Sequence, residues 1–257
     1  MLIVGAGYNG TDIIYYGRKK DGKKGYLKVR AIRPYFYVEG EGEEGITSID
    51  GRKLKKIYTE RPQDVPMERV KYPETWEADI PFVFRNWIDS GYYKYIDEET
   101  LKPAKENIQP RKCYIDIEVD DTSGFPNPEQ AGDPILSIVF YDSYFNYYNI
   151  LTYKKVNTFE LLDKIGKLNF KLRLFSTEEE MLRSFYRYAT DPDTAPDVIL
   201  GWNVEFDYEY LSNRMAKYGL HLNRNEYTVF DLMTAYERLH ENDVESLSLE
   251  YIASLEL

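Results

Sequence analysis

Beginning at Cys113, segments with the two-residue period of a β-strand alternate with segments whose apolar residues recur at helical spacing. Strands are expected at 113–119, 134–141, 147–153, 197–202 and 227–232, and helices after 176–179, from about 206 to 218, and from 248 to 257. Such alternation is typical of a layered α/β domain, in which helices cover a sheet. The segment at 176–179 reads as a capping box, in which Ser176 caps the helix and Glu179 reaches back.

The residues before Cys113 have a different pattern. Apolar alternation at 12–16 and 26–30 flanks a polar turn around Asp21, which predicts a hairpin in a β-rich module. Residues 99–112 combine prolines with mixed charges, a composition typical of a linker. The sequence therefore predicts a β-rich amino-terminal domain at 1–108 and an α/β domain at 109–257.

Composition limits the class of protein. Hydrophobic residues make up 43% of the 257 residues, sufficient for a folded core. The single cysteine, Cys113, excludes a framework of internal disulfides. No apolar run approaches the roughly 20 residues needed to cross a bilayer, and the first residues lack the basic flank of a secretion signal. These features predict an intracellular protein with no membrane partner.

The net charge of −11 argues against a simple basic surface for nucleic acid. An acidic chain can still bind DNA if its carboxylates hold divalent cations against the phosphate, or if a basic region lies elsewhere. The charge by itself favours neither explanation.

The strand at 113–119 carries two acidic residues on one face. Asp116 and Glu118 are two positions apart, so both carboxylates point away from the apolar side chains that alternate with them. Two neighbouring anions repel one another unless a cation lies between them, and oxygen ligands suit Mg²⁺ or Mn²⁺. The pair therefore indicates a metal site. The alternative is a strand edge with two solvated acids.

A second acidic motif follows the strand at 197–202. The chain turns at Asn203 and places Asp207 in the first turn of the next helix, at the end of a sheet where α/β folds bind ligands. The alternative interpretation is structural: Asn203 caps this helix and Asp207 complements its dipole.

Together these motifs resemble the first two exonuclease motifs of family B DNA polymerases. The matching residues are Asp116-Ile117-Glu118 and Asn203-x-x-Phe206-Asp207. The sequences at 115–131, 141–143, 201–205 and 248–252 are closely similar to polymerases of T-even-type bacteriophages. The sequences at 33–37, 61–66 and 79–82 are more similar to archaeal family B enzymes. The resemblance covers nearly the whole chain in the same order.

The resemblance implies the amino-terminal and proofreading 3′→5′ exonuclease portion of a DNA-directed DNA polymerase. Its exonuclease fold is RNase H-like, a mixed sheet flanked by helices, and it hydrolyses the mispaired primer end with two Mg²⁺ or Mn²⁺ ions. By this resemblance Asp116 bridges both ions, Glu118 holds one ion and orients water, and Asp207 binds the second ion. Phe125 matches an aromatic residue that stacks on frayed bases, the alternative being a loop anchor, and Asn203 supports the DNA-binding site.

The family's fourth carboxylate belongs to a Tyr-x-x-x-Asp motif. Tyr227 and Asp231 have this spacing, but they follow Asp207 too soon, and Asp231 is expected to end a strand and start a helix instead. His240, near Glu241 and Asp243, is read as an exposed loop residue rather than a general base. The chain is therefore expected to be weak or inactive alone, as a cloned fragment, a proteolytic product or one half of a split polymerase.

The resemblance to archaeal enzymes implies a second site in the amino-terminal domain. It is a pocket that senses uracil in the template and excludes the methyl group of thymine. The matching positions are Tyr8, Pro34, Tyr35, Val65, Ile80, Pro81 and Arg85. The alternative is that these apolar side chains form an ordinary core.

The implied partners are single-stranded DNA, primer-template DNA and a separate or truncated palm, fingers and thumb region, with a sliding clamp as a further candidate. The implied location is the cytoplasm of a prokaryotic or phage-infected cell. Two other functions remain open: a non-catalytic template-binding or uracil-sensing module, and a free-standing RNase H-like nuclease that processes RNA. Titration with divalent metal distinguishes the polymerase exonuclease from a non-catalytic module. A downstream reading frame encoding a palm and thumb distinguishes the polymerase exonuclease from a free-standing nuclease.

Overall fold

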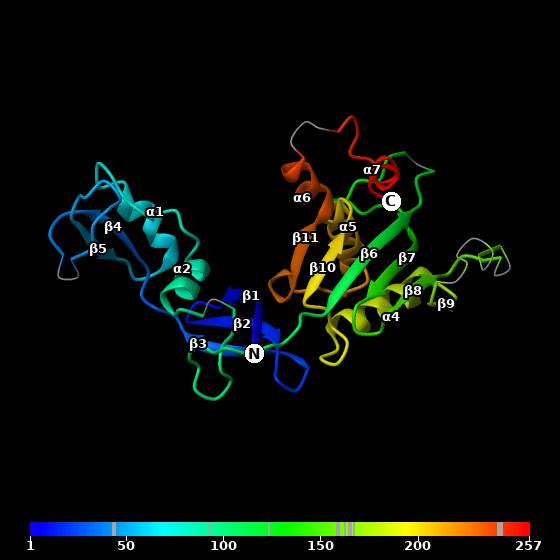
Figure 1. Cartoon of the computed structure of the whole chain (residues 1–257), viewed down its shortest axis with the longest axis horizontal. Helices are drawn as coiled ribbons and strands as arrows, with labels where there is room; N and C mark the ends of the chain where they lie inside the picture. The colour runs from blue at the N-terminus through cyan, green and yellow to red at the C-terminus, as the bar shows by residue number, and fades with distance from the viewer. Residues whose placement is uncertain are drawn as a thin grey trace. The chain divides into compact units, whose positions relative to one another are not determined.

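The computed structural model describes residues 1–42, 45–92, 94–122, 124–157, 160–161, 163, 166, 168–240 and 244–257 (Figure 1). The chain forms two compact units. The larger unit consists of Met1–Gly5, Tyr16–Gly25 and Asn107–Leu257, and the smaller of Ala6–Tyr15 and Tyr26–Glu106. The domain boundary at 108/109 stays a prediction.

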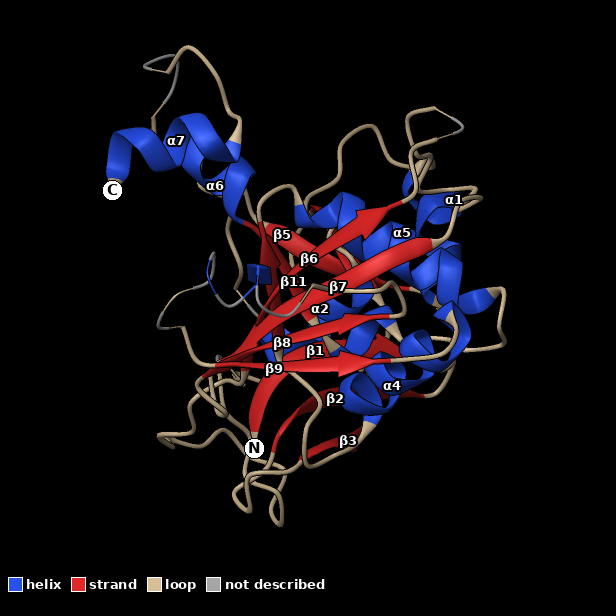
Figure 2. Cartoon of the chain, turned by 90° about the vertical axis from the view of Figure 1, so that its right-hand side faces the viewer, coloured by secondary structure: helices blue, strands red, loops and turns tan. Residues whose placement is uncertain are grey.

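A six-stranded mixed sheet forms the centre of the larger unit (Figure 2). Its strand order is β11-β10-β6-β7-β8-β9 (Figure 1). Its strands are β6 (Lys112–Val119), β7 (Ile135–Asp142), β8 (Tyr147–Thr152), β9 (Phe170–Leu174), β10 (Val198–Gly201) and β11 (Thr228–Asp231). β10 pairs in parallel with both β6 and β11, β8 pairs in parallel with β9, and β7 is antiparallel to β6 and β8. The α/β class with a mixed sheet is confirmed.

Two long helices bury their apolar faces in the core of this unit. They are α4 (Glu178–Thr190) and α5 (Val204–Ala216). Met181, Leu182 and Phe185 of α4 lie in one hydrophobic cluster with Ile115 of β6 and Leu211 of α5. In the sequence, Met181, Leu182 and Phe185 recur at helical spacing, and this spacing corresponds to the buried face of α4.

The start of α4 differs from the prediction by one residue. Thr177 is the N-cap, and its hydroxyl accepts a hydrogen bond from the backbone N–H of Glu180 at 3.2 Å. The carboxylate of Glu180 accepts from the backbone N–H of Ser176 at 3.0 Å. The assignment of Ser176 and Glu179 as the capping pair was wrong, because adjacent Ser-Thr and Glu-Glu-Glu residues offer two registers of the same box.

The remaining elements of the larger unit follow β10 and β11. They are the 3₁₀ turn η2 (Arg224–Glu226), α6 (Leu232–Leu239) and α7 (Leu249–Glu256). Gly219, with φ of 71°, ends the region of α5 in the left-handed conformation that glycine permits. Ser248 caps α7 by accepting from the backbone N–H of Tyr251.

The amino-terminal half is rich in strands, as expected. β1 (Leu2–Tyr8), β2 (Asp12–Arg18) and β3 (Lys24–Arg30) form a sheet in that order, and β4 (Tyr35–Glu39) pairs antiparallel with β5 (Leu54–Tyr58). The 3₁₀ turn η1 (Pro62–Asp64) and the helices α1 (Val65–Arg69) and α2 (Phe82–Asp89) follow. Among the described residues, no helix combines the length and apolar character needed to cross a bilayer.

Candidate active site

Asp116 and Glu118 lie on the open face of β6, one of the central strands of the sheet. Both are exposed, whereas Ile115 and Ile117 between and beside them are 5% and 8% exposed on the opposite face. The register with β7 shifts between Glu118 and Val119, so regular pairing ends directly after the second acid. The predicted orientation of the two carboxylates is confirmed.

A tight approach of two strands fixes the position of the second motif. A Cβ atom at Gly201, the last residue of β10, would lie 2.6 Å from the carbonyl oxygen of Ile115, so the packing of β10 on β6 requires glycine there. Two residues later Asn203 adopts the left-handed conformation with φ of 60°. This turn starts α5 close to the acidic face of β6.

Asn203 does not cap α5 with its side chain, so that part of the structural alternative is wrong. Instead its backbone N–H donates to the carboxylate of Asp231 at 2.8 Å. Asparagine tolerates the left-handed conformation better than most residues, which explains its presence at this turn.

Asp207 lies in the first turn of α5 and is only 7% exposed. Burial, first, and the nearby negative charges of Asp116, Glu118 and Asp231 together raise the pKa of its carboxyl group to about 7. Asp116 is exposed on the face of β6, but the surrounding protein partly desolvates its carboxyl group and so raises its pKa. The two motifs, far apart in the sequence, thus meet closely enough for their charges to interact.

The donor chemistry of these residues fits divalent ions. Among the described residues, the carboxylates of Asp116, Glu118 and Asp207 have no ion-pair or hydrogen-bond partner to compensate their charge. In the same part of the chain, no group of three or more His, Cys, Asp or Glu side chains is close enough to form a ready-made metal site. Carboxylate oxygens suit Mg²⁺ and Mn²⁺, so the site has suitable ligands without a preformed coordination sphere.

Asp231 is a helix cap, as the sequence predicted. It ends β11, and its carboxylate accepts from the backbone N–H of Met233 at 3.1 Å and from the hydroxyl of Thr234 at 2.8 Å. With the bond from Asn203, three donors occupy this carboxylate. Its role is to hold the start of α6 beside the turn at Asn203.

Phe125 is 91% exposed and follows Gly124, which has φ of 125°. Its ring centroid lies 6.0 Å from that of Phe206 on α5, next to Asp207 in the sequence. An aromatic ring so exposed is not anchored in a core, and its contact with Phe206 places it near the start of α5.

His240 follows α6 as its C-cap, and its ring stacks on Tyr236 with a centroid distance of 4.1 Å and an interplanar angle of 20°. Its predicted neighbours Glu241 and Asp243 lie outside the described residues. The stacking gives His240 a structural contact within its own helix.

The smaller unit contains a cavity of about 340 Å³. Six of the seven residues assigned to the uracil pocket line it: Pro34, Tyr35, Val65, Ile80, Pro81 and Arg85. Tyr8 does not line it, but its ring packs edge-on against Phe82, which does, at 5.0 Å. The six lining residues therefore surround an open space rather than a filled core.

The sequence analysis missed Glu77, which also lines this cavity and forms an ion pair with Arg85 at 2.5 Å. Glu77 has φ of 58°. Its position depends on a loop conformation rather than on a strand or helix period, so no sequence pattern indicated it.

Comparison with known proteins gives a consistent result. The family described as "DNA polymerase family B, exonuclease domain" matches residues 75–244. Similar curated proteins are DNA polymerases of Thermococcus sp. (strain GE8), 28% identical over 82% of this chain, and of Pyrococcus glycovorans, 29% identical over 86%. A DNA polymerase of Thermococcus gorgonarius is 31% identical over 66% of the chain. The chain spans 13%, 30% and 20% of the lengths of these relatives, respectively.

Proposed function

Because the chain belongs to the family B DNA polymerases and contains their exonuclease domain, we propose that Asp116, Glu118 and Asp207 form its 3′→5′ proofreading site. The observation that supports the proposal is the placement of Asp207, buried in the first turn of α5, near enough to the exposed face of β6 for the charges of Asp116 and Glu118 to act on it. The substrate is the frayed 3′ end of a primer, and the reaction is hydrolysis of its last phosphodiester bond.

Each carboxylate has a separate task in this proposal. Two Mg²⁺ or Mn²⁺ ions, when bound, would supply an activated water and stabilise the leaving oxygen. Asp116 would contribute to holding both ions, Glu118 would hold one and orient the water, and Asp207 would hold the other. The burial of Asp207 keeps its carboxylate fixed on the first turn of α5.

Phe125 positions the substrate in this scheme. Its exposed ring stacks on a base of the unpaired end, a contact that contributes about 1–3 kcal/mol and reads no sequence. Asn203 acts indirectly, since the turn that it forms sets the start of α5. A proofreading site requires such sequence-independent binding because any base can be misincorporated.

Titration with Mn²⁺ tests the proposal. We expect the wild-type chain to bind two ions and Asp116→Asn to bind fewer ions or to bind them more weakly. Asp64→Asn, whose carboxylate pairs with Arg61 in the smaller unit, should bind as the wild type does. A wild-type chain that binds no Mn²⁺ at millimolar concentration would leave a non-catalytic template-binding module as the better description.

The 257-residue polypeptide is expected to degrade single-stranded DNA more slowly than an intact proofreading polymerase. The Tyr-x-x-x-Asp residue of this chain, Asp231, is engaged as a helix cap and is not available as a fourth ligand. We propose that full activity requires a palm, fingers and thumb region, with primer-template DNA as the shared substrate and a sliding clamp as a further partner. Degradation at the rate of an intact proofreader, abolished by Asp116→Ala, would contradict this expectation, and a preference for RNA would favour a free-standing nuclease.

A second function, sensing of uracil in template DNA, is favoured by the cavity of about 340 Å³ in the smaller unit. Its apolar residues Val65, Ile80 and Pro81 suit a flat base, and thymine carries a methyl group that adds volume. Fluorescence titration with single strands containing either base tests this function. Tighter binding of the uracil strand, lost in Val65→Phe, is expected, and equal affinities would remove the proposal.

A further inference from the structure

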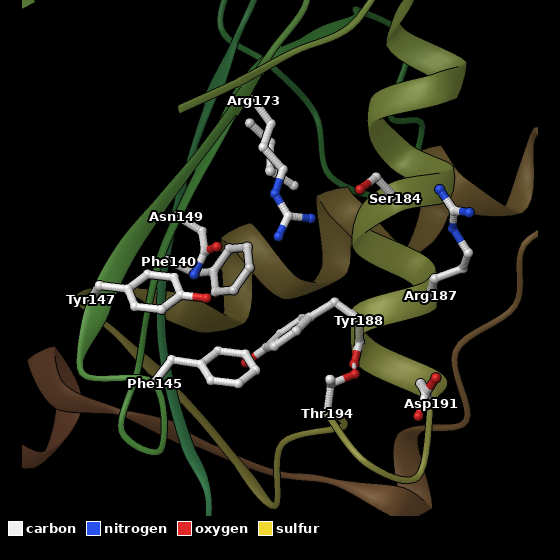
Figure 3. Close-up of a pocket in the computed structure, with 11 residues that line it drawn as sticks. Phe140, Phe145, Tyr147, Asn149, Arg173, Ser184, Arg187, Tyr188, Asp191 and Thr194 are labelled. Atoms are coloured by element: carbon white, nitrogen blue, oxygen red, sulfur yellow. Dashed lines mark hydrogen bonds between the residues drawn. The ribbon is translucent and has the colours of Figure 1, made fainter. Parts of the chain in front are cut away.

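A separate cavity of about 410 Å³ lies in the larger unit between α4 and the edge of the sheet (Figure 3). Phe140 of β7, which lines it, pairs with Ile115 of β6 and therefore shares the face opposite to Asp116. The cavity thus belongs to the other side of the sheet from the two exposed acids of β6. Its volume lies within the roughly 300–1,000 Å³ range of small-molecule sites.

The floor of this cavity contains a buried polar group without a partner. Asn149 of β8 is 3% exposed and lines the cavity beside Phe140 and Leu151. Within the described residues, the nitrogen of its amide group has no hydrogen-bond partner. Buried amides are rarely left unsatisfied, so this donor is available to an acceptor atom inside the cavity.

Aromatic rings and guanidinium groups complete the lining. Phe145 and Tyr147 have nearly parallel rings, 5.4 Å apart with an interplanar angle of 8°. Arg173 of β9 points into the space from one side, and Arg187 of α4 lies on the other (Figure 3). Neither arginine forms an ion pair with any described residue. Asp191 contributes a carboxylate to the lining of the same cavity. The two arginines and this aspartate together give the lining of the cavity a net charge of +1.

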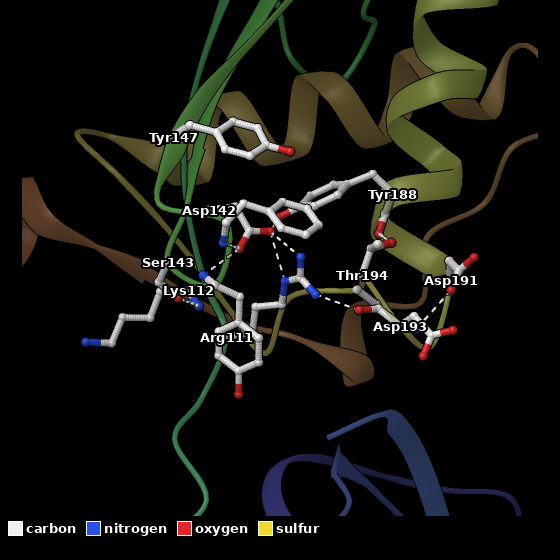
Figure 4. Close-up of polar contacts among 12 residues, drawn as sticks. Arg111, Lys112, Asp142, Ser143, Tyr147, Tyr188, Asp191, Asp193 and Thr194 are labelled. Atoms are coloured by element: carbon white, nitrogen blue, oxygen red, sulfur yellow. Dashed lines mark hydrogen bonds and ion pairs between the residues drawn. The ribbon is translucent and has the colours of Figure 1, made fainter. Parts of the chain in front are cut away.

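The wall of the cavity is held in place from behind (Figure 4). The hydroxyl of Tyr188 donates to Asp142 at 2.7 Å, and Asp142 also accepts from Nε of Arg111 at 2.9 Å. The hydroxyl of Thr194 donates to the carbonyl oxygen of Tyr188 at 2.8 Å. A wall fixed in this way is pre-organised, which lowers the cost of ordering it around a ligand.

We propose that this cavity binds a free mononucleotide of the nucleoside 5′-monophosphate class. The base lies against the aromatic rings and accepts from the amide of Asn149, while the phosphate pairs with Arg173 and Arg187. One net positive charge and the volume of a single nucleotide favour a free mononucleotide over a strand, whose successive phosphates need a longer basic surface. Hydrolysis of a DNA 3′ end releases this class of molecule, but binding here does not depend on the proposed nuclease activity.

Isothermal titration calorimetry of the full chain with each of the four deoxynucleoside 5′-monophosphates tests the proposal. EDTA is present throughout, so metal-dependent binding at Asp116 does not contribute. We expect saturable binding with one site, weaker binding of deoxynucleosides and of inorganic phosphate alone, and no effect of Asp116→Asn.

Three variants locate the site. Asn149→Leu, which keeps the side-chain size, is expected to weaken binding about tenfold, the effect of losing one hydrogen bond. Arg173→Gln alters an exposed side chain and should weaken the nucleotide about as much while leaving the nucleoside unchanged. Arg183→Gln is the control, because Arg183 lies on the same helix but pairs with Glu179 and does not line this cavity. Circular dichroism confirms that each variant is folded.

The proposal fails if the wild-type chain binds no monophosphate at millimolar concentration, or if folded Asn149→Leu and Arg173→Gln both bind as the wild type does. It also fails if a short single-stranded oligonucleotide binds more tightly than the monophosphate and this binding depends on Asn149. In that case the cavity would hold part of a strand rather than a free nucleotide.

Discussion

At the scale of single residues, the acidic site combines burial with repulsion. Asp207 is buried in the first turn of α5, and the charges of Asp116 and Glu118 act on it from β6. An arrangement of this kind is costly for the metal-free chain and becomes favourable when cations bind.

Asp207→Asn should therefore stabilise the metal-free protein at neutral and alkaline pH. In the folded chain the pKa of Asp207 is about 7, above its usual value of 3.8. The contribution of its protonated carboxyl group to the free energy of unfolding is therefore fully present below about pH 4 and is lost as pH rises through 7. Each pKa unit corresponds to about 1.4 kcal/mol, so Asp207→Asn should raise the free energy of unfolding at pH 8 by a few kcal/mol. Thermal unfolding in EDTA at pH 5 and pH 8 measures it.

The same comparison with saturating Mn²⁺ should reverse the order, since the ion stabilises only a chain that can bind it. An Asp207→Asn variant less stable than the wild type at pH 8 in EDTA would show that the carboxylate has a partner in solution.

Phe125→Ala should weaken binding of single-stranded DNA about tenfold, because one stacked base contributes about 1–3 kcal/mol. Stability should not change, since the ring is 91% exposed. Fluorescence anisotropy with Ca²⁺ in place of a catalytic ion measures the affinity. Tyr26→Ala, which removes another exposed ring in the smaller unit, is the control. Equal losses in the two variants would contradict a specific role for Phe125.

At the scale of elements, the start of each helix depends on one or two polar side chains. Thr177 caps α4, Asp231 caps α6 and Ser248 caps α7, whereas α5 starts from the left-handed turn at Asn203. The two helices whose starts lie beside the acidic site are thus joined by the bond from Asn203 to Asp231.

Thr177→Ala should lower the free energy of unfolding of the larger unit by about 1 kcal/mol, the usual cost of removing an N-cap. Ser176→Ala is the matched control and should have a smaller effect, because the Ser176 backbone, not its hydroxyl, provides the bond to Glu180. Urea denaturation followed by circular dichroism compares the two. A larger loss in Ser176→Ala would restore the register that the sequence suggested.

At the scale of the whole molecule, the larger unit includes residues from the start of the chain. Arg18 is fully buried, and its Nε donates to Asp197 at 2.9 Å. Asp197 also accepts from the backbone N–H of Arg111 at 2.8 Å, directly before β6. An amino-terminal strand thus supplies the counter-charge for a buried acid next to β10.

Arg18→Met should destabilise the larger unit by about 3–5 kcal/mol, because it leaves Asp197 buried without its cation. Arg30→Met, which breaks an exposed pair with Asp12 at 3.8 Å, is the control and should cost less than about 1 kcal/mol. Differential scanning calorimetry measures both.

A fragment of residues 109–257 lacks Arg18 as well and should unfold at a lower temperature than the full chain. If the fragment and the Arg18→Met variant are as stable as the wild type, the predicted boundary at 108/109 describes an independent domain.

The sequence by itself determined the α/β class, the face of β6 that carries Asp116 and Glu118, and the buried face of α4. These features follow from local periods of two and 3.6 residues, which act within a single element. The register of the α4 cap was missed because neighbouring residues offer equivalent caps.

Only the tertiary structure decided how these elements meet. The close packing of Gly201 on β6, the raised pKa of Asp207, the contact of Arg18 with Asp197 and the cavity around Asn149 each join segments that are distant in the sequence. Such features depend on which strands are neighbours and on the burial that results, and no local period encodes either.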